Sequence, residues 1–345
     1  MRRRTLLSAT AAFSLLTLTT ACATGAGSSA TAKDGTTTVT LALDWTPNTN
    51  HTGIYVALRK GWFKDAGIDL RIVPYGSTAP ETLIANHKAD FGISYQEGVT
   101  TARAAGQDIT SVYAVTQKTD VTIAVRADRD DISSPKDLDG RTYAGFGAPY
   151  EKPLLEKVIR NAGGKGDFQQ VTLNTSAYAA LYAGKADFAM PMPTWEGLEA
   201  ELSGKPLKNF QLSDYGFPAI YSTLVASSDQ YLKKNPDLAR KFLAAVDRGY
   251  RYAAAHPDRA AGLLVAANKS VLTHTELVEK SERLLAKEYY KGADGTIGTQ
   301  SAARWQAFAD FEYRAGLLSD ADGHKLTAAP DASEFFTNAY LPDTK

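Results

Sequence analysis

Cysteine is almost absent from the sequence, and its charges balance. Cys22 is the only cysteine among 345 residues, so neither an internal disulfide nor a cysteine-rich metal site can form. Lys and Arg together number 38, and so do Asp and Glu. Because a nucleic-acid-binding surface needs a clustered basic excess, we expect no nucleic-acid partner. With 44% hydrophobic residues, the chain is long enough and apolar enough for two globular domains.

The motifs of common catalytic and cofactor sites are missing as well. No two of the five histidines are four residues apart beside an acid, as a helical zinc site requires. The sequence has no G-x-S-x-G elbow, no G-x-x-x-x-G-K-[ST] loop and no G-x-G-x-x-G fingerprint. We therefore expect no metal, no nucleotide and no cofactor.

The first 22 residues have the pattern of an export signal. Three arginines at 2–4 precede an apolar run that is too short, and too rich in Ser and Thr, to span a bilayer. The stretch 19–22, Thr-Thr-Ala-Cys, resembles the lipobox of bacterial lipoproteins, although its leucine is displaced to Leu18. The three arginines are compatible with either the Sec or the twin-arginine export route.

This pattern predicts where the protein works. We expect export to the periplasm or to the outer face of the cell membrane, with Cys22 lipidated and the lipid as the only membrane anchor. Residues 23–38 are rich in Gly, Ser, Ala and Thr, which predicts a flexible tether. The folded body follows the tether.

A ten-residue stretch, 44–53, concentrates polar and aromatic groups between an apolar run and a helical pattern. The run at 39–43 predicts a buried strand, and residues 48–52 offer caps for a helix over about 53–60. Ligands of parallel α/β sheets bind beyond the carboxyl ends of the strands, where free helix N–H groups point outward. We interpret this stretch, called the elbow below, as a binding loop. The alternative is that Trp45 plugs the core and the amides only cap the helix.

A short sequence occurs twice in the chain. Lys-Ala-Asp-Phe begins at residue 88 and again at residue 185, each time between a predicted helix and a predicted strand. Gln-Glu-Gly follows the first copy and Trp-Glu-Gly the second, which places Glu97 and Glu196 at strand ends. The repeat predicts two similar α/β lobes that present these acids towards a shared cleft.

The predicted fold is therefore α/β, with two lobes, each a mostly parallel sheet flanked by helices. After a strand at 222–227 we expect only helices, at 235–255, 258–268, 273–290, 301–317 and 331–340. This tail is expected to pack on the first lobe, which makes that lobe discontinuous, 39–123 and 223–345, around a second lobe at 124–222. Two connections between the lobes would form a hinge.

Aromatic and polar side chains recur together at the predicted strand ends. Such a set suits a flat heteroaromatic ligand, because rings cover its faces while polar groups satisfy its edge. Any one ring could instead fill the core, and Glu151 could simply favour a helix N-terminus. The expected ligand-binding residues are Trp45, Asn48, His51, Tyr95, Glu97, Tyr150, Glu151, Trp195, Glu196 and Tyr221.

The segments 44–53 and 61–70 resemble the thiamine-precursor-binding and pyrimidine-synthase-like branch of type II periplasmic binding proteins. The likeness extends over roughly 40–270, and 232–236 and 240–243 also fit it. The bacterial members imply a receptor that captures a formylaminopyrimidine for an ABC permease and its ATPase. The fungal members imply an enzyme that makes the thiamine pyrimidine from its own histidine and pyridoxal phosphate.

The chain itself separates these two outcomes. By the resemblance, His51 matches the histidine that the fungal enzyme consumes, but that enzyme also has a cysteine-rich iron motif before the return strand. Residues 217–221 are Phe-Pro-Ala-Ile-Tyr here, without cysteine. We therefore expect a monomeric binding protein and not an enzyme, with Trp45, Asn48 and the Trp195-Glu196 pair on the pyrimidine. Receptors for riboflavin, an aliphatic sulfonate or nitrate stay as alternatives; acidic, aromatic walls disfavour the anions.

Overall fold

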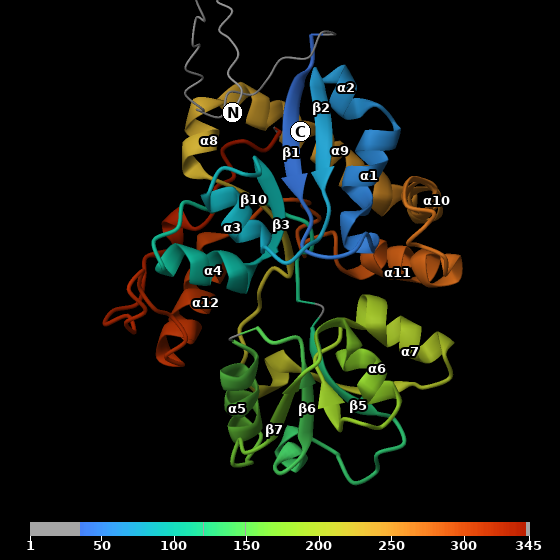
Figure 1. The fold of residues 1–345 in the computed structure, drawn as a ribbon, viewed down its shortest axis with the longest axis vertical. Helices are drawn as coiled ribbons and strands as arrows, with labels where there is room; N and C mark the ends of the chain where they lie inside the picture. Colours follow the sequence, from blue (N-terminus) through green and yellow to red (C-terminus); the bar gives the residue numbers. More distant parts are fainter. Residues whose placement is uncertain (1–34, 120, 149, 343–345) are drawn as a thin grey trace, which may run out of the picture.

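A computed structural model describes residues 35–119, 121–148 and 150–342. The expected export signal, Cys22 and most of the expected tether lie outside the described residues. Within them, no helix has both the length and the apolar character needed to cross a membrane. Two α/β lobes stand one above the other, and thin connecting segments join them (Figure 1).

The first lobe is built on a sheet in the order β2-β1-β3-β10-β4. Strands β2 and β3 both run parallel to β1, whereas β10 is antiparallel to β3 and to β4. The strands are β1 (Thr37–Ala42), β2 (Ile68–Val73), β3 (Phe91–Tyr95), β4 (Thr110–Ala114) and β10 (Thr223–Ser227).

The second lobe repeats this arrangement in the order β7-β6-β8-β5-β9. Here β7 and β8 run parallel to β6, and β5 is antiparallel to both of its neighbours. Both sheets are therefore mixed, but only one strand in each, β10 or β5, runs against the other four, so the predicted mostly parallel sheets are confirmed. The strands are β5 (Thr122–Arg126), β6 (Thr142–Gly145), β7 (Gln169–Thr172), β8 (Phe188–Ala189) and β9 (Leu207–Gln211).

The repeated Lys-Ala-Asp-Phe sequence has the same structural task in each lobe. Asp90 precedes β3, and its carboxylate accepts a 2.8 Å hydrogen bond from the backbone nitrogen of Thr40 on β1. Asp187 precedes β8 and accepts a 2.9 Å bond from the backbone nitrogen of Thr142 on β6. The acid of each copy thus ties the start of one strand to its parallel neighbour, which confirms that the repeat marks equivalent positions.

Helices cover both sheets. The long C-terminal helix α9 packs on α1, and both contribute to a core with the first sheet. The first lobe holds α1 (Thr52–Arg59), α2 (Trp62–Asp65), α3 (Pro80–Ala85), α4 (Gln96–Ala104), α8 (Asp229–Lys234), α9 (Pro236–Ala255), α10 (Pro257–Ala267), α11 (Thr275–Glu288) and α12 (Ala302–Arg314). The second lobe holds α5 (Glu151–Asn161), α6 (Ala177–Tyr182) and α7 (Leu198–Leu202).

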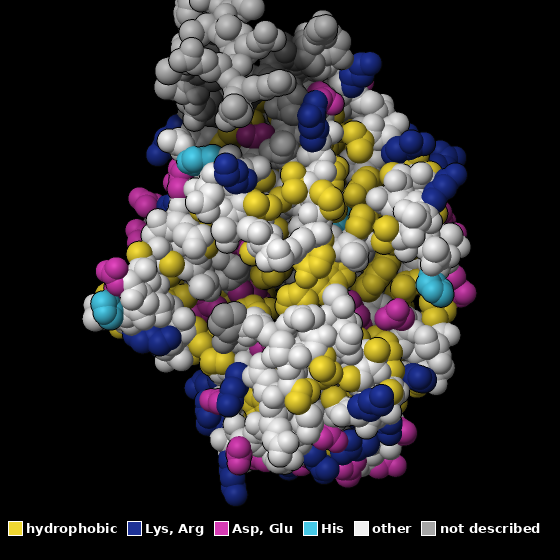
Figure 2. All heavy atoms as spheres, in the orientation of Figure 1, with side chains coloured by type: hydrophobic (Ala, Val, Ile, Leu, Met, Phe, Trp, Pro, Cys, Tyr) yellow, Lys and Arg dark blue, Asp and Glu magenta, His cyan; other side chains and the backbone are white. Residues whose placement is uncertain are grey.

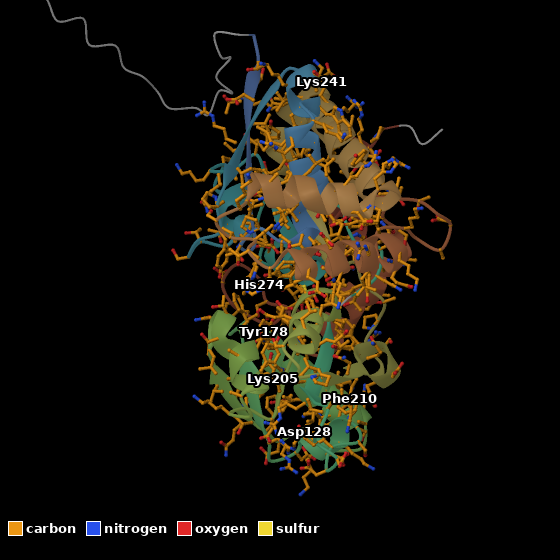
Figure 3. All side chains as sticks on the ribbon, turned by 90° about the vertical axis from the view of Figure 1, so that its right-hand side faces the viewer. Asp128, Tyr178, Lys205, Phe210, Lys241 and His274 are labelled. Carbon is orange, nitrogen blue, oxygen red and sulfur yellow. The ribbon has the colours of Figure 1, made fainter. Side chains whose placement is uncertain are left out.

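The side view shows how far the two lobes extend. Lys241 of α9 lies at the outer end of the first lobe and Asp128 near the outer end of the second, whereas Tyr178 and His274 lie near the junction (Figure 3). Apolar side chains gather over the middle of the face shown in Figure 2. The predicted cleft should therefore lie at the junction of the two lobes.

One predicted helix is wrong, and one strand was not predicted. Residues 331–340 do not form a helix: only Ala332–Glu334 make a 3-10 turn, capped by Asp331, and Phe336 then bridges to Ser111 of β4. The cause is packing, because the Phe336 ring stacks on buried Trp305 at 6.0 Å and 3°. The strand β9 (Leu207–Gln211) was not predicted; only one of its five residues is buried.

Candidate ligand-binding site

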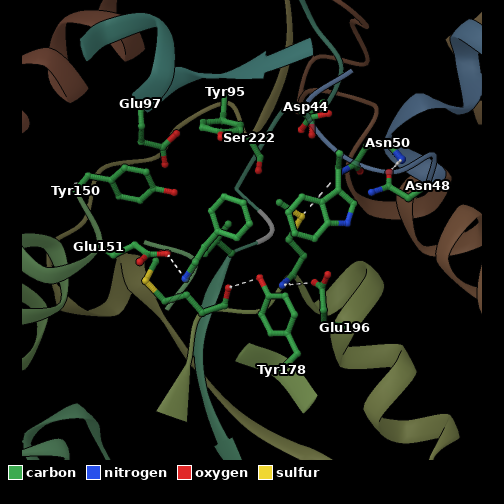
Figure 4. A pocket seen from close by; sticks show the side chains of 16 residues that line it. Asp44, Asn48, Asn50, Tyr95, Glu97, Tyr150, Glu151, Tyr178, Glu196 and Ser222 are labelled. Atoms are coloured by element: carbon green, nitrogen blue, oxygen red, sulfur yellow. Dashed lines mark hydrogen bonds between the residues drawn. The ribbon is translucent and has the colours of Figure 1, made fainter. Parts of the chain in front are cut away.

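A cavity of about 120 Å³ lies between the lobes (Figure 4). Its wall combines four carboxylates, a group of aromatic rings, two amides and two thioethers, and no described residue of this wall is Lys, Arg or His. The lining residues are Asp44, Trp45, Asn48, Asn50, Tyr95, Glu97, Val121, Phe146, Tyr150, Glu151, Tyr178, Met190, Met192, Glu196, Ser222 and Thr223.

The elbow is fixed by hydrogen bonds within itself. Asn48 caps a 3-10 turn, Thr49–His51, by accepting from the backbone nitrogen of Asn50 at 2.9 Å. The backbone nitrogen of Asn48 donates to Nδ1 of His51 at 3.2 Å, so the ring proton is on Nε2, which donates to Asp44 at 2.9 Å. His51 is fully buried. His51 therefore lies behind the cavity wall, and its hydrogen bond positions the Asp44 carboxylate in that wall.

Polar side chains of α9 and α11 in the first lobe support the elbow through hydrogen bonds. Tyr250 of α9 donates to the carbonyl of Asn50 at 2.7 Å. Glu282 of α11 accepts from the hydroxyls of Thr52 and Tyr290. Burial raises the pKa of Glu282 to about 8, and the two hydrogen bonds oppose that rise. This carboxyl is therefore protonated at neutral pH.

Three of the four cavity carboxylates lie at the starts of helices, where the N-terminal dipole favours negative charge. Glu97 is in the first turn of α4, Glu151 begins α5, and Glu196 lies in a π-helical turn, Pro193–Gly197. Glu151 accepts from the backbone nitrogens of Phe146 at 3.0 Å and Gly147 at 2.9 Å, and Glu196 accepts from that of Met192 at 3.0 Å. These carboxylates therefore occupy N–H groups that an anionic ligand would otherwise use.

Tyrosine hydroxyls complete the polar part of the wall. Burial, followed by the nearby carboxylates, raises the pKa of Tyr95, Tyr150 and Tyr178 well above the ordinary value. Burial also raises the pKa of Glu151. The hydroxyls thus stay protonated and offer hydrogen-bond donors beside carboxylate acceptors, a mixture that suits a ligand edge carrying both acceptor and donor nitrogens.

The two lobes touch each other around the cavity, as contacts between described residues show. The Trp45 ring of the elbow lies 5.2 Å from the Phe146 ring of the second lobe, between centroids. The Asn50 side-chain nitrogen lies 3.8 Å from the Met192 sulfur. Trp195 of the second lobe packs on an apolar cluster formed by α1, α10 and α11. The structure therefore has the lobes in contact.

The structure brings seven of the ten predicted residues to the cavity and leaves three outside it. Trp45, Asn48, Tyr95, Glu97, Tyr150, Glu151 and Glu196 line the wall. His51 lies behind the wall and Trp195 in the apolar cluster on the first lobe. Tyr221 is buried, accepts from the Ser301 backbone nitrogen at 2.8 Å, and its ring lies 4.3 Å from the Arg304 guanidinium.

Sequence reasoning missed nine lining residues. Two of them, Asp44 and Asn50, belong to the elbow itself and carried a signal in its composition. Met190 and Met192 follow the second Lys-Ala-Asp-Phe copy, as Glu97 follows the first, so the repeat could have indicated them. The others had no comparable signal: Val121, Phe146, Tyr178, Ser222 and Thr223.

Two α/β lobes with a ligand-sized cavity between them define the class of two-lobed periplasmic binding proteins. Solved structures agree on the fold: the alkanesulfonate-binding protein SsuA of Xanthomonas axonopodis pv. citri, bound to MOPS, aligns with a TM-score of 0.64 at 16% identity, covering 82% of this chain and 95% of that one. The periplasmic aliphatic sulphonate-binding protein SsuA of Escherichia coli aligns with a TM-score of 0.61 at 18% identity, covering 89% and 94%.

The chain belongs to the NMT1/THI5-like family, whose model matches residues 48–260. It is similar to the formylaminopyrimidine-binding protein of Halalkalibacterium halodurans, 29% identical over 305 residues, which covers 86% of this chain and 88% of that protein. It is also similar to the 4-amino-5-hydroxymethyl-2-methylpyrimidine phosphate synthase THI5 of Saccharomyces cerevisiae, 26% identical over 234 residues, covering 64% and 68%. The chain is thus similar both to a binding protein and to a synthase.

Proposed function

We propose that this protein is the extracytoplasmic solute-binding component of an ABC importer and captures a thiamine pyrimidine precursor of the formylaminopyrimidine or hydroxymethylpyrimidine type. The similarity to a formylaminopyrimidine-binding protein over most of both chains supports this proposal. The observation that carries it is the cavity, which joins aromatic faces to carboxylate and tyrosine groups.

The size of the cavity favours a single ring. Its volume is about 120 Å³, and a protein cavity of roughly 150 Å³ holds benzene. A pyrimidine matches this scale, whereas the three fused rings and ribityl chain of riboflavin exceed it with the lobes in this arrangement. An aminopyrimidine would donate from its amino group to a carboxylate and accept from a tyrosine hydroxyl at its ring nitrogens.

The charges of the wall disfavour anions. A sulfonate or nitrate needs cationic side chains or free N–H groups. The described lining residues include no cation, and Glu151 and Glu196 already take nearby N–H groups. The likeness to the sulfonate-binding structures therefore extends to the fold and not to the chemistry of the wall.

The same chemistry argues for binding rather than synthesis. Pyridoxal phosphate carries a phosphate, and the described wall has no Lys or Arg to receive it, so these residues do not fit that group. Both ring nitrogens of His51 are engaged, one with the Asn48 backbone and one with Asp44. We assign His51 the task of positioning the elbow.

Capture would proceed by closure of the lobes. Ligand enters the open cleft, binds one lobe, and stabilises the closed form by the contacts that the second lobe adds. In this proposal the lobes comprise 39–123 with 223–345 and 124–222, the closed monomer is what a permease recognises, and lipidated Cys22 with its tether keeps the protein at the membrane.

Calorimetry with 4-amino-5-hydroxymethyl-2-methylpyrimidine and its formylaminomethyl analogue tests the site. We expect Trp45→Ala and Glu196→Gln each to weaken binding about tenfold or more, because each removes a buried contact to the ring or its edge. Trp62→Ala, whose half-buried ring packs against Tyr252 and does not line the cavity, and Glu201→Gln, at the exposed end of α7, are matched controls and should bind as the unaltered protein does. Equal affinity of all four variants would refute the site.

A further inference from the structure

The methionines of this chain have an uneven distribution. The sequence contains three, of which one is Met1. The other two, Met190 and Met192, both line the interlobe cavity, and both are half-buried. A thioether is flexible and polarizable, and oxidation to the sulfoxide makes it polar.

The two methionines differ in what they contact. Met190 packs on the core of the second lobe, and its carbonyl oxygen accepts from the Tyr178 hydroxyl at 3.5 Å. The Met192 sulfur instead faces the first lobe, where the Asn50 side-chain nitrogen lies 3.8 Å away (Figure 4). Met192 follows the short strand β8, and its backbone is held by Glu196. The Asn50–Met192 contact is thus a polar latch between the lobes.

We propose that Met192 is a site of reversible oxidation and that its sulfoxide tightens this latch. In the step, the Met192 sulfur attacks one oxygen of hydrogen peroxide, an S–O bond forms, and the O–O bond breaks. The thioether is oxidised to a sulfoxide, and the peroxide is reduced to water. A sulfoxide reductase reverses the change.

The geometry determines the direction of the effect. A thioether sulfur is a weak hydrogen-bond acceptor, whereas the sulfoxide oxygen is a strong one. The 3.8 Å between the Asn50 nitrogen and the sulfur exceeds the roughly 2.9 Å of an N–H···O bond, so an oxygen on the sulfur fits beside that line and accepts from the amide. Oxidation therefore favours the arrangement in which the two lobes touch, and a ligand enters the cleft more slowly.

Spin-label distances between the lobes test the latch without any ligand. Because Cys22 is the only cysteine, the full chain with Cys22→Ser accepts two new labels, at His274→Cys in the first lobe and Lys205→Cys in the second. Both positions are exposed and lie on the same side of the molecule (Figure 3). After peroxide, with peptide mass spectrometry confirming the sulfoxide at Met192, we expect the population at the shorter distance to rise about fivefold over the longer one. One ordinary hydrogen bond has an effect of this size.

The variants assign the effect to one sulfur and its partner. Each is compared with itself before and after peroxide. Met190→Leu should keep the response, whereas Met192→Leu, which has no sulfur, and Asn50→Leu, which has no amide donor, should lose it. Treatment with sulfoxide reductases should restore the original distances. An unchanged distribution in oxidised protein, or a response lost in Met190→Leu and kept in Met192→Leu, would overturn the proposal.

Association kinetics extend the test and rest on the proposed function. With 4-amino-5-hydroxymethyl-2-methylpyrimidine as the probe, we expect the association rate to fall about fivefold on oxidation of the unaltered chain and not of Met192→Leu. If the reduced protein does not bind this probe, the proposed function fails, while the spin-label distances still decide the latch. If the probe binds and oxidation leaves its association rate unchanged, the latch fails alone.

Discussion

Glu282 is a buried acid that supports the elbow without facing the cavity. Its pKa is raised from 4.5 to about 8 by burial, so the folded protein keeps a proton that the unfolded chain loses above about pH 4.5. The stability from this protonated carboxyl is full below that pH and is lost as the pH rises through 8. We therefore expect the melting temperature of the unaltered protein, relative to Glu282→Gln, to fall steadily between pH 5 and pH 8.

Glu279→Gln is the control, since this residue lies on the same helix but is exposed. Its melting temperature relative to the unaltered protein should not change with pH over that range. A pH-independent difference for Glu282→Gln would show that the carboxyl is ionised in the folded protein as well.

Sequence and structure agree best on residues that directly follow a strand. Trp45, Tyr95 and Glu97 could be predicted because the carboxyl ends of parallel strands meet at one edge of a sheet. Tyr178 could not, because it projects from within α6, where a helical pattern gives no sign of the cavity. Trp195 was predicted on a ligand as the aromatic half of a pair with Glu196, but adjacent residues on a helical turn point in different directions.

At the level of elements, the packing of α1 on α9 sets the position of the elbow. A Cβ on Gly249 of α9 would lie 1.9 Å from the backbone oxygen of Gly53 on α1, which no side-chain movement can relieve. We expect Gly249→Ala to lower the free energy of unfolding by about 3 kcal/mol, measured by urea titration, and to weaken pyrimidine binding as α1 shifts.

Gly262 offers the matched substitution. It lies within α10, and a Cβ there would meet nothing within 4 Å. Gly262→Ala should stabilise the protein by about 0.5 kcal/mol, because alanine is the better helix former. If Gly249→Ala is as harmless as Gly262→Ala, the helices are not in the close contact described here.

The elements that sequence patterns predicted well are those with strong local signals. The helices predicted at 235–255 and 258–268 agree with α9 and α10 to within one residue at each end. The helix predicted at 331–340 does not form, because the two phenylalanines of this segment contact Trp305 and β4, which are distant in sequence. Local propensity cannot register such contacts.

For the whole molecule, Trp195 connects the lobes outside the cavity. Its ring packs on the cluster that includes Tyr55 and Leu264 of the first lobe. We expect Trp195→Ala to favour separated lobes, so the radius of gyration of the ligand-free protein in X-ray scattering should increase, and bound pyrimidine should reverse the increase. Trp62→Ala, which removes a half-buried ring that packs within the first lobe, should leave the radius unchanged. An unchanged radius in Trp195→Ala would mean that this contact does not hold the lobes together.

The position of β10 has a consequence for how the polypeptide is made. This strand lies between β3 and β4, and within the described sheet β4 pairs only with β10. All five strands of the second sheet lie between residues 122 and 211, so they are complete before β10 emerges from the ribosome. The inserted lobe can therefore fold first, as a continuous unit. The sheet of the first lobe cannot be completed until residue 227 has been synthesised, because β3 and β4 have no common partner before β10 is available.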